Sequence, residues 1–204
     1  MQDLLPPTEK RKELELRALG LRDFAGVSGD QPLDPFALAE FARLLVVDFD
    51  GIEGLSAESR AHLLGEAVNE WSGGACSRPL PNGWRLVILN PAHGMQRNRA
   101  TLMEEISHVF LGHQANRLAA VDREKGGRML ARDYNHDDEE AAYAVGTAAL
   151  VPYAPLRRLV WQGRRASEIA RHFRVSRQLV EYRIKVTHLW AQYKDSSATR
   201  ADHV

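Results

Sequence analysis

One stretch constrains the fold of this chain more than any other, residues 99–113, which read RATLMEEISHVFLGH. Its apolar positions recur at helical spacing, at Leu102, Ile106 and Val109. No proline or glycine interrupts the run before Gly112, so the stretch predicts an amphipathic helix that begins a turn or more before its acidic pair.

Glu104 and His108 are four residues apart on this helix, and their side chains therefore project from the same face. Two such side chains can bind one divalent ion, and the acid that follows the first, Glu105, can act as general base on a water. The spacing is that of an H-E-x-x-H zinc helix with Glu at the first position. Because acidic pairs near a histidine are also common on solvated helices, the alternative is an ordinary charged face.

Composition excludes several classes of protein. The formal net charge of the 204 residues is zero, so no overall field directs the chain to nucleic acid or to a membrane. The single cysteine, Cys76, excludes an internal disulfide and a cysteine-based zinc cluster, and it suits a reducing compartment. We expect a soluble, cytoplasmic protein, because the charged N-terminal segment is unlike a signal peptide and no apolar run could span a bilayer.

Local signals predict the elements that precede this stretch. Helices are expected at residues 8–19, stopped by Gly20, from Pro35 onward after the N-cap Asp34, and at 56–69 after the N-cap Ser56, with a strand at 46–49.

A β-hairpin is expected around Pro81-Asn82-Gly83, between residues 75–80 and 84–90, because Asn-Gly supplies the positive φ of a tight turn. The second strand leads into the candidate metal helix, where a peptidase would align an extended substrate by strand addition. Its candidate substrate contacts are Trp84, Leu86, Ile88 and Asn90. The alternative is an ordinary core strand.

A second helix is predicted in NHDDEEAAYAVGTAALVP, residues 135–152, with small residues that allow close packing. Its acidic first turn has two explanations. The carboxylates compensate the helix dipole, or one of them, Glu139 or Glu140, supplies a third metal ligand.

Three segments in this order resemble the ImmA/IrrE family of zinc metallopeptidases: WRLVILNP, RATLMEEISHVFLGH and EEAAYAVGTAALVP. The resemblance covers about residues 33–155. It implies an α+β, mainly helical, zincin-like domain with a small sheet, with one divalent metal. It makes His108 a ligand and Glu105 the general base, and it places the third ligand at Glu140, with Glu139 as the alternative register.

The resemblance also implies a function. By this resemblance, we expect a bacterial or phage metalloendopeptidase that acts in transcription regulation and stress response. It would relieve repression by cleaving a helix-turn-helix repressor in the cytoplasm. Here Glu104 departs from the family pattern, which has histidine at that position. We expect the extra carboxylate to weaken the nucleophile and to shift the metal preference from zinc toward manganese. The alternative is a catalytically inactive regulator that binds a repressor or DNA.

His113 is expected to lie away from this site. It follows His108 by five residues, so helical periodicity turns it away from the Glu104 face and toward the apolar stripe. We interpret it as a histidine at the C-terminal end of the helix, where it interacts favourably with the negative end of the helix dipole.

The C-terminal segment is strongly basic: Arg157, Arg158, Arg164, Arg165, Arg171, Arg174, Arg177, Arg183 and Lys185 are set against Glu168 and Glu181 alone. Within it, ASEIARHFRVSRQLVEYRI resembles a helix-turn-helix, with N-caps at Ser167 and Ser176 and a turn in which Arg174 stands where glycine is preferred.

Two readings of this segment remain open. It binds DNA, with Arg177, Gln178, Glu181 and Tyr182 facing the major groove, or it is a structural helical pair that is docked on the peptidase domain or contacts a protein partner. We expect a peptidase-like domain at residues 1–153, a helical segment at 154–193 and a disordered tail at 194–204.

Overall fold

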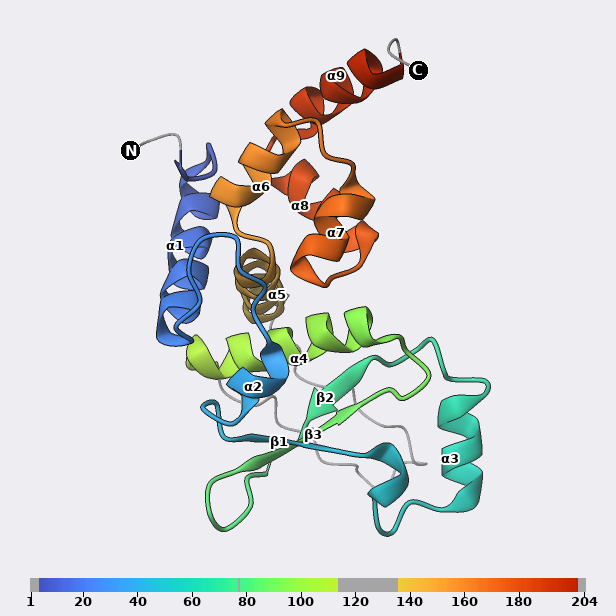
Figure 1. Ribbon diagram of the computed structural model, residues 1–204. Coiled ribbons are helices and arrows are strands. Elements are labelled where there is room, and N and C mark those ends of the chain that lie inside the picture. Colours follow the sequence, from blue (N-terminus) through green and yellow to red (C-terminus); the bar gives the residue numbers. More distant parts are fainter. Residues whose placement is uncertain (1–3, 77, 114–135, 202–204) are drawn as a thin grey trace.

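Helix α4 (Met95–Phe110) lies between the β-sheet and most of the other helices (Figure 1). The structure, a computed structural model, describes residues 4–76, 78–113 and 136–201. Before α4 the chain forms α1 (Glu9–Phe24), α2 (Pro35–Ala39), β1 (Leu44–Val47), the 3-10 turn η2 (Phe49–Gly51), α3 (Ala57–Leu64), β2 (Gly73–Ala75) and β3 (Arg85–Leu89). After it come α5 (His136–Leu150), α6 (Tyr153–Trp161), α7 (Ala166–Phe173), α8 (Arg177–Val186) and α9 (Trp190–Ala201).

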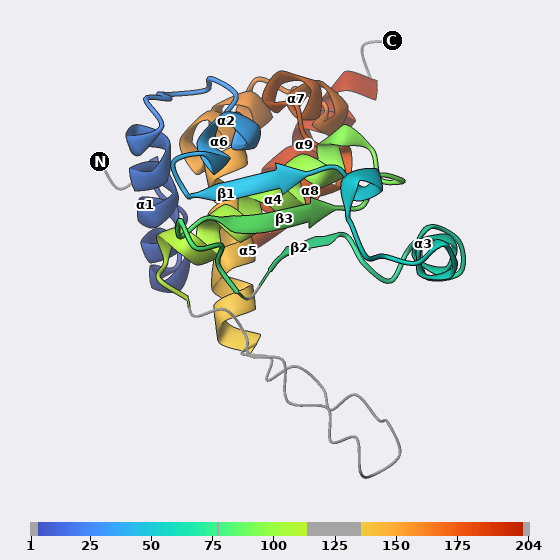
Figure 2. The same cartoon turned by 90° about the horizontal axis from the view of Figure 1, so that it is seen from below.

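The sheet has three strands in the order β1-β3-β2, which lie side by side in Figure 2. β3 pairs with β1 in parallel and with β2 antiparallel. The predicted turn is confirmed, since the Leu80 amide donates to the Trp84 carbonyl at 2.7 Å and Gly83 has φ +82°. The strand before it, expected at residues 75–80, lies at 73–75 instead. β3 is therefore the central strand, and β2 is an outer one.

α4 and α5 pack closely because α5 presents small side chains to its neighbour. A Cβ on Gly146 would lie 3.2 Å from both the Met103 carbonyl and the Ser107 hydroxyl. Since residue 146 meets residue 103, while Glu139 reaches His108, the two helices run antiparallel. This crossing brings the first turn of α5 against the last turns of α4.

The C-terminal helices are anchored on the domain by a buried ion pair. The Glu15 carboxylate of α1 accepts from Arg183 Nη2 of α8 at 2.6 Å and from the Tyr153 amide at 2.6 Å. Both side chains are at most 2% exposed, and Arg183 also donates to the Val151 carbonyl at 3.0 Å. Arg183 therefore joins α8 to α1 inside the protein, although the sequence placed it among the basic residues of the C-terminal segment.

α7 and α8 pack against each other and both bury apolar side chains, and Ser176 caps α8 by accepting from the Leu179 amide at 3.2 Å. Arg174 adopts the left-handed conformation, φ +56°, at the turn between them. Ser167 is not the cap of α7, which begins at Ala166 with Arg165 as N-cap. The helix-turn-helix interpretation of this pair stays a prediction.

Several predicted boundaries are wrong. α1 continues past Gly20 to Phe24, because Arg22 is buried and donates to the Ala149 carbonyl at 2.8 Å. β1 begins at residue 44, α3 ends at Leu64 before Gly65, and the residues expected as a tail continue α9 to Ala201. None of the described helices combines the length and apolarity that a membrane span needs.

Candidate metal-binding cleft

A cleft of about 1780 Å³ runs along the last turns of α4. Its walls come from β2 and its flanking residues, from α3, and from the first turn of α5. The side chains of metal-ligating types that line it are Glu104, Glu105 and His108 of α4, His113 just beyond α4, Asp138 and Glu139 of α5, and Cys76 just after β2. The two candidate ligands of the α4 face therefore open into one cleft, and they share it with two acids of α5.

Glu139, and not Glu140, lies next to His108. The Glu139 Oε2 atom is 3.4 Å from His108 Nε2, and the two side chains are 23% and 21% exposed. Glu140 accepts an ion pair from Lys10 of α1 at 3.0 Å, and this contact holds its pKa below the usual range. Successive residues of a helix are rotated by about 100°, so α5 can direct only one of the two carboxylates toward α4.

Glu104 is placed where its charge is unfavourable. Burial raises the pKa of its carboxyl to about 7, and the nearby charges of Glu105 and Glu139 add to the effect. No hydrogen bond or ion pair of Glu104 is found within the described parts of the chain. A divalent cation next to these carboxylates would relieve their repulsion.

His113 lies beside His108, which the sequence analysis did not expect. Its Nδ1 atom is 3.0 Å from Nδ1 of His108, and its Nε2 atom is 3.6 Å from the Asp138 carboxylate. Burial lowers the pKa of His113; Asp138 opposes this effect, and His108 adds to it. The position predicted from helical periodicity is therefore wrong.

His113 lies beside His108 because of the way in which α4 ends. Gly112, with φ +73°, donates to the Val109 carbonyl at 3.1 Å, and the His113 amide donates to the His108 carbonyl at 3.0 Å. These are the two bonds of a Schellman motif, which turns the chain back over the last helical turn. Gly112 was the available sequence signal, because glycine marks such helix ends.

The imidazole and carboxylate side chains of the cleft suit a divalent cation, although their ligand atoms do not converge on one point. Imidazole and carboxylate are both zinc and manganese ligands. Among the described residues, the only group of three such side chains with ligand atoms within 4.8 Å of one another is His136, Asp137 and Glu140, at the exposed start of α5. Binding by Glu104, His108 and Glu139 thus requires side-chain rotations within the cleft.

Tyr143 lies one turn beyond Glu139 on α5, and its ring contacts that of Tyr182 on α8 at 5.2 Å. Burial raises the pKa of the Tyr143 phenol, and Tyr182 and Glu104 act in the same direction. The packing of Tyr143 against Tyr182 agrees with a role in joining α8 to the domain.

The predicted substrate strand is corrected by the sheet order. β3 is hydrogen-bonded on both sides, by β1 and β2, so it has no open edge along the paired residues. Asn90 is fully buried, and its amide donates to the Val68 and Trp71 carbonyls. Of Trp84, Leu86, Ile88 and Asn90, Ile88 lines the cleft. The strand that lines the cleft and is outermost in the sheet is β2.

The four residues predicted to contact DNA or a partner differ in position. Arg177 and Gln178 are exposed at the start of α8, and Arg177 Nε donates to Glu181 at 2.7 Å. Tyr182 is directed toward Tyr143 instead. Arg177, Gln178 and Glu181 can therefore reach an external partner without rearrangement, and Tyr182 is half-buried against Tyr143.

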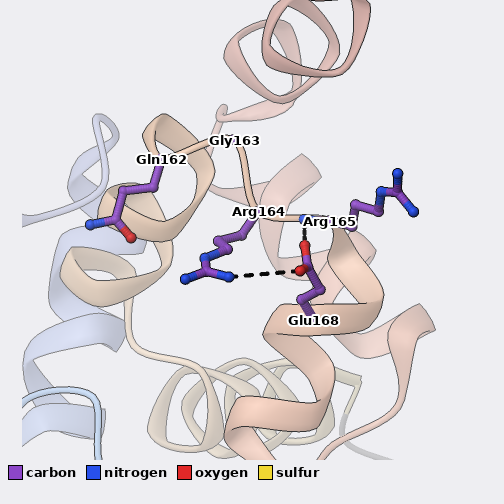
Figure 3. A pocket seen from close by; sticks show the side chains of 5 residues that line it. All are labelled: Gln162, Gly163, Arg164, Arg165 and Glu168. Atoms are coloured by element: carbon purple, nitrogen blue, oxygen red, sulfur yellow. Dashed lines mark hydrogen bonds and ion pairs between the residues drawn. The ribbon is translucent and has the colours of Figure 1, made fainter. Parts of the chain in front are cut away.

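A second, more open pocket lies between the end of α6 and the start of α7 (Figure 3). Arg164 and Glu168 face each other across it at 3.7 Å, and Glu168 also accepts from the Arg165 amide at 2.7 Å. The Arg165 side chain points away from the pocket. Its charges are satisfied locally, so we assign it no ligand.

A comparison with protein-family models gave a match. A model of the family described as the IrrE N-terminal-like domain, Peptidase_M78, matches residues 75–185. A comparison with curated proteins gave no match. The matched range runs from β2 through α4 and α5 to α8, and so it contains most of the cleft and also the helices beyond the expected boundary at residue 153.

Proposed function

The chain belongs to the ImmA/IrrE family, whose Peptidase_M78 model covers more than half of it, and from this premise we propose a divalent-metal-dependent endopeptidase. The observation that carries the proposal is the contact between His108 of α4 and Glu139 of α5, 3.4 Å apart in a cleft that Glu104 and Glu105 also line. Two helices distant in sequence thereby assemble imidazole and carboxylate donors around one space.

In this proposal His108 and Glu139 hold the ion, and Glu104 is the third donor. Zinc is the first choice of metal, and manganese the second, since a set rich in carboxylates favours a harder ion. When bound, the cation would act as a Lewis acid toward a peptide carbonyl and would increase the acidity of the attacking water.

Glu105 is the proposed general base. It follows Glu104 on α4 and lines the same cleft, so its carboxylate can take a proton from a water and return it to the leaving amine. Its partial burial limits competition from bulk water. In this proposal Glu105 carries the proton, and Glu104, His108 and Glu139 bind the ion.

The proposed substrate position is along β2. Gly73, Gly74 and Ala75 line the cleft, and β2 is the outer strand on that side of the described sheet. An extended peptide could add to this edge by backbone hydrogen bonds, which would place it along the Glu105 face of α4. A Cβ on Gly74 would meet no atom within 4 Å, so this position leaves room for a second backbone, whereas glycine at position 73 accommodates the Ile88 carbonyl of β3.

The proposed substrate is a helix-turn-helix repressor in the cytoplasm. The test is to co-express the chain with a repressor encoded beside it and to look for a repressor fragment. We expect a fragment with the wild-type chain and with Glu140→Gln, and no fragment with Glu105→Gln. A fragment that persists in Glu105→Gln, or none in any strain, contradicts the proposal.

One observation favours a second candidate, a regulator that binds a repressor or DNA without cleavage. Glu104 occupies the first ligand position, and the ligand atoms of Glu104, His108 and Glu139 do not lie together within 4.8 Å. Exposed Arg177 and Gln178 would then contact the partner. Salt-sensitive, sequence-selective DNA binding that is lost in Arg177→Ala would support this function.

A further inference from the structure

His113 lies where a second imidazole ligand is needed. The family pattern has histidine at the position of Glu104, and this chain lacks it. The His108 and His113 rings have centroids 5.1 Å apart and planes inclined by 70°. With His113 12% exposed, both rings lie within the cleft and not on the outer surface.

The backbone fixes this proximity. The His113 amide donates to the carbonyl of His108 itself, and Gly112 adopts the positive φ that the reversal requires. Rotation of a side chain can change the distance between the two rings, but it cannot move the two Cα positions apart. Any ion next to His108 is therefore within reach of His113.

The distances agree with a shared ion. Zn–N bonds of about 2.0–2.1 Å in a tetrahedral site place two ligand nitrogens roughly 3.3 Å apart. The two Nδ1 atoms are separated by 3.0 Å, and His108 Nε2 is 3.4 Å from Glu139. His108 contacts the two partners through different nitrogens, so its ring must rotate to bring all three donors to one point.

We propose that His113 is a ligand of the metal ion and replaces the histidine absent from position 104. The ion is then held by His108, His113 and Glu139, which is the two-imidazole, one-carboxylate set of catalytic zinc sites. This inference rests on the proposed function, because it requires an ion in the cleft. It differs in one ligand, since His113 takes the place of Glu104. Glu104 then lies next to the ion without binding it.

Zinc titration of the full-length, metal-free chain tests this assignment, with a competing chelator dye as readout and cobalt absorption as a second one. We expect His113→Asn to weaken zinc binding by more than about 100-fold, since loss of an outer-shell partner alone costs about 10- to 100-fold. Glu104→Gln removes a neighbour of the ion and not a ligand, so it should weaken zinc binding by less than about 100-fold on the same scale. His136→Asn, in the exposed cluster at the start of α5, is the matched control and should bind as wild type.

A rescue variant separates loss of a ligand from loss of the fold. Glu104→His added to His113→Asn restores the family pattern and should recover at least about tenfold in zinc affinity. Wild-type affinity in His113→Asn, with loss in Glu104→Gln, overturns the inference and leaves the proposed function standing. A wild-type chain that binds no ion, or one that loses it only in His136→Asn, overturns both.

Discussion

Glu104→Gln should stabilise the metal-free protein, and by an amount that depends on pH. The carboxyl of Glu104 lies in the cleft with its pKa raised from 4.5 to about 7, first by burial and then by Glu105 and Glu139. The folded state therefore binds this proton more tightly than the unfolded state. The amide of glutamine has a similar shape and cannot ionise.

The sign and size follow from proton linkage. A raised pKa contributes stability that is fully present below about pH 4.5 and is lost as pH rises through about 7. The pKa difference is worth about 3 kcal/mol at about 1.4 kcal/mol per pH unit, as an upper value because water in the cleft screens the charges. Wild type and Glu104→Gln should thus be nearly equal at pH 4.5 and differ by up to about 3 kcal/mol at pH 8.

Urea unfolding of both proteins between pH 4.5 and 8, with a chelator present, measures this difference. Glu140→Gln is the matched control, since Lys10 lowers the pKa of Glu140 and its effect has the opposite sign. A free-energy difference between wild type and Glu104→Gln that stays constant over this range would refute the argument that burial and the neighbouring carboxylates raise the pKa of Glu104.

Three further substitutions test how the helices pack, each by urea unfolding. Arg183→Met leaves the Glu15 carboxylate buried without its partner and should cost about 3–5 kcal/mol, whereas the double variant with Glu15→Leu should cost much less; equal losses would contradict this. Arg174→Gly should raise the unfolding free energy by up to about 1 kcal/mol, because it relieves a left-handed conformation, and no gain would count against that explanation. Gly146→Leu should cost about 1–3 kcal/mol and also weaken zinc binding, since it separates α4 from α5; unchanged zinc affinity would show that the crossing does not position the site.

The sequence predicted the elements that build the site, because their signals are local. The spacing of Glu104 and His108 on an amphipathic helix, the Asn82-Gly83 turn and the small residues of α5 each depend on neighbours within a few positions. These features are found in the structure with shifts of a few residues at their ends. The family assignment followed from the order of the same segments, and the family model agrees with it.

What the sequence could not supply is the rotation of one element against another. The choice between Glu139 and Glu140 depends on how α5 is turned, and the close approach of Gly146 to α4 fixes that rotation. The central place of β3 depends on β1, which pairs with it from about forty residues away. His113 was misplaced for another reason, since helical periodicity was extended past the end of the helix at Phe110.

The central claim is that the cleft beside His108 binds a divalent cation, and calorimetric titration of zinc into the metal-free chain tests it most directly. The account predicts one ion per wild-type chain, the same stoichiometry in His136→Asn, and no saturable binding in His108→Asn. Equal binding by wild type and His108→Asn, or no binding by either, would contradict it.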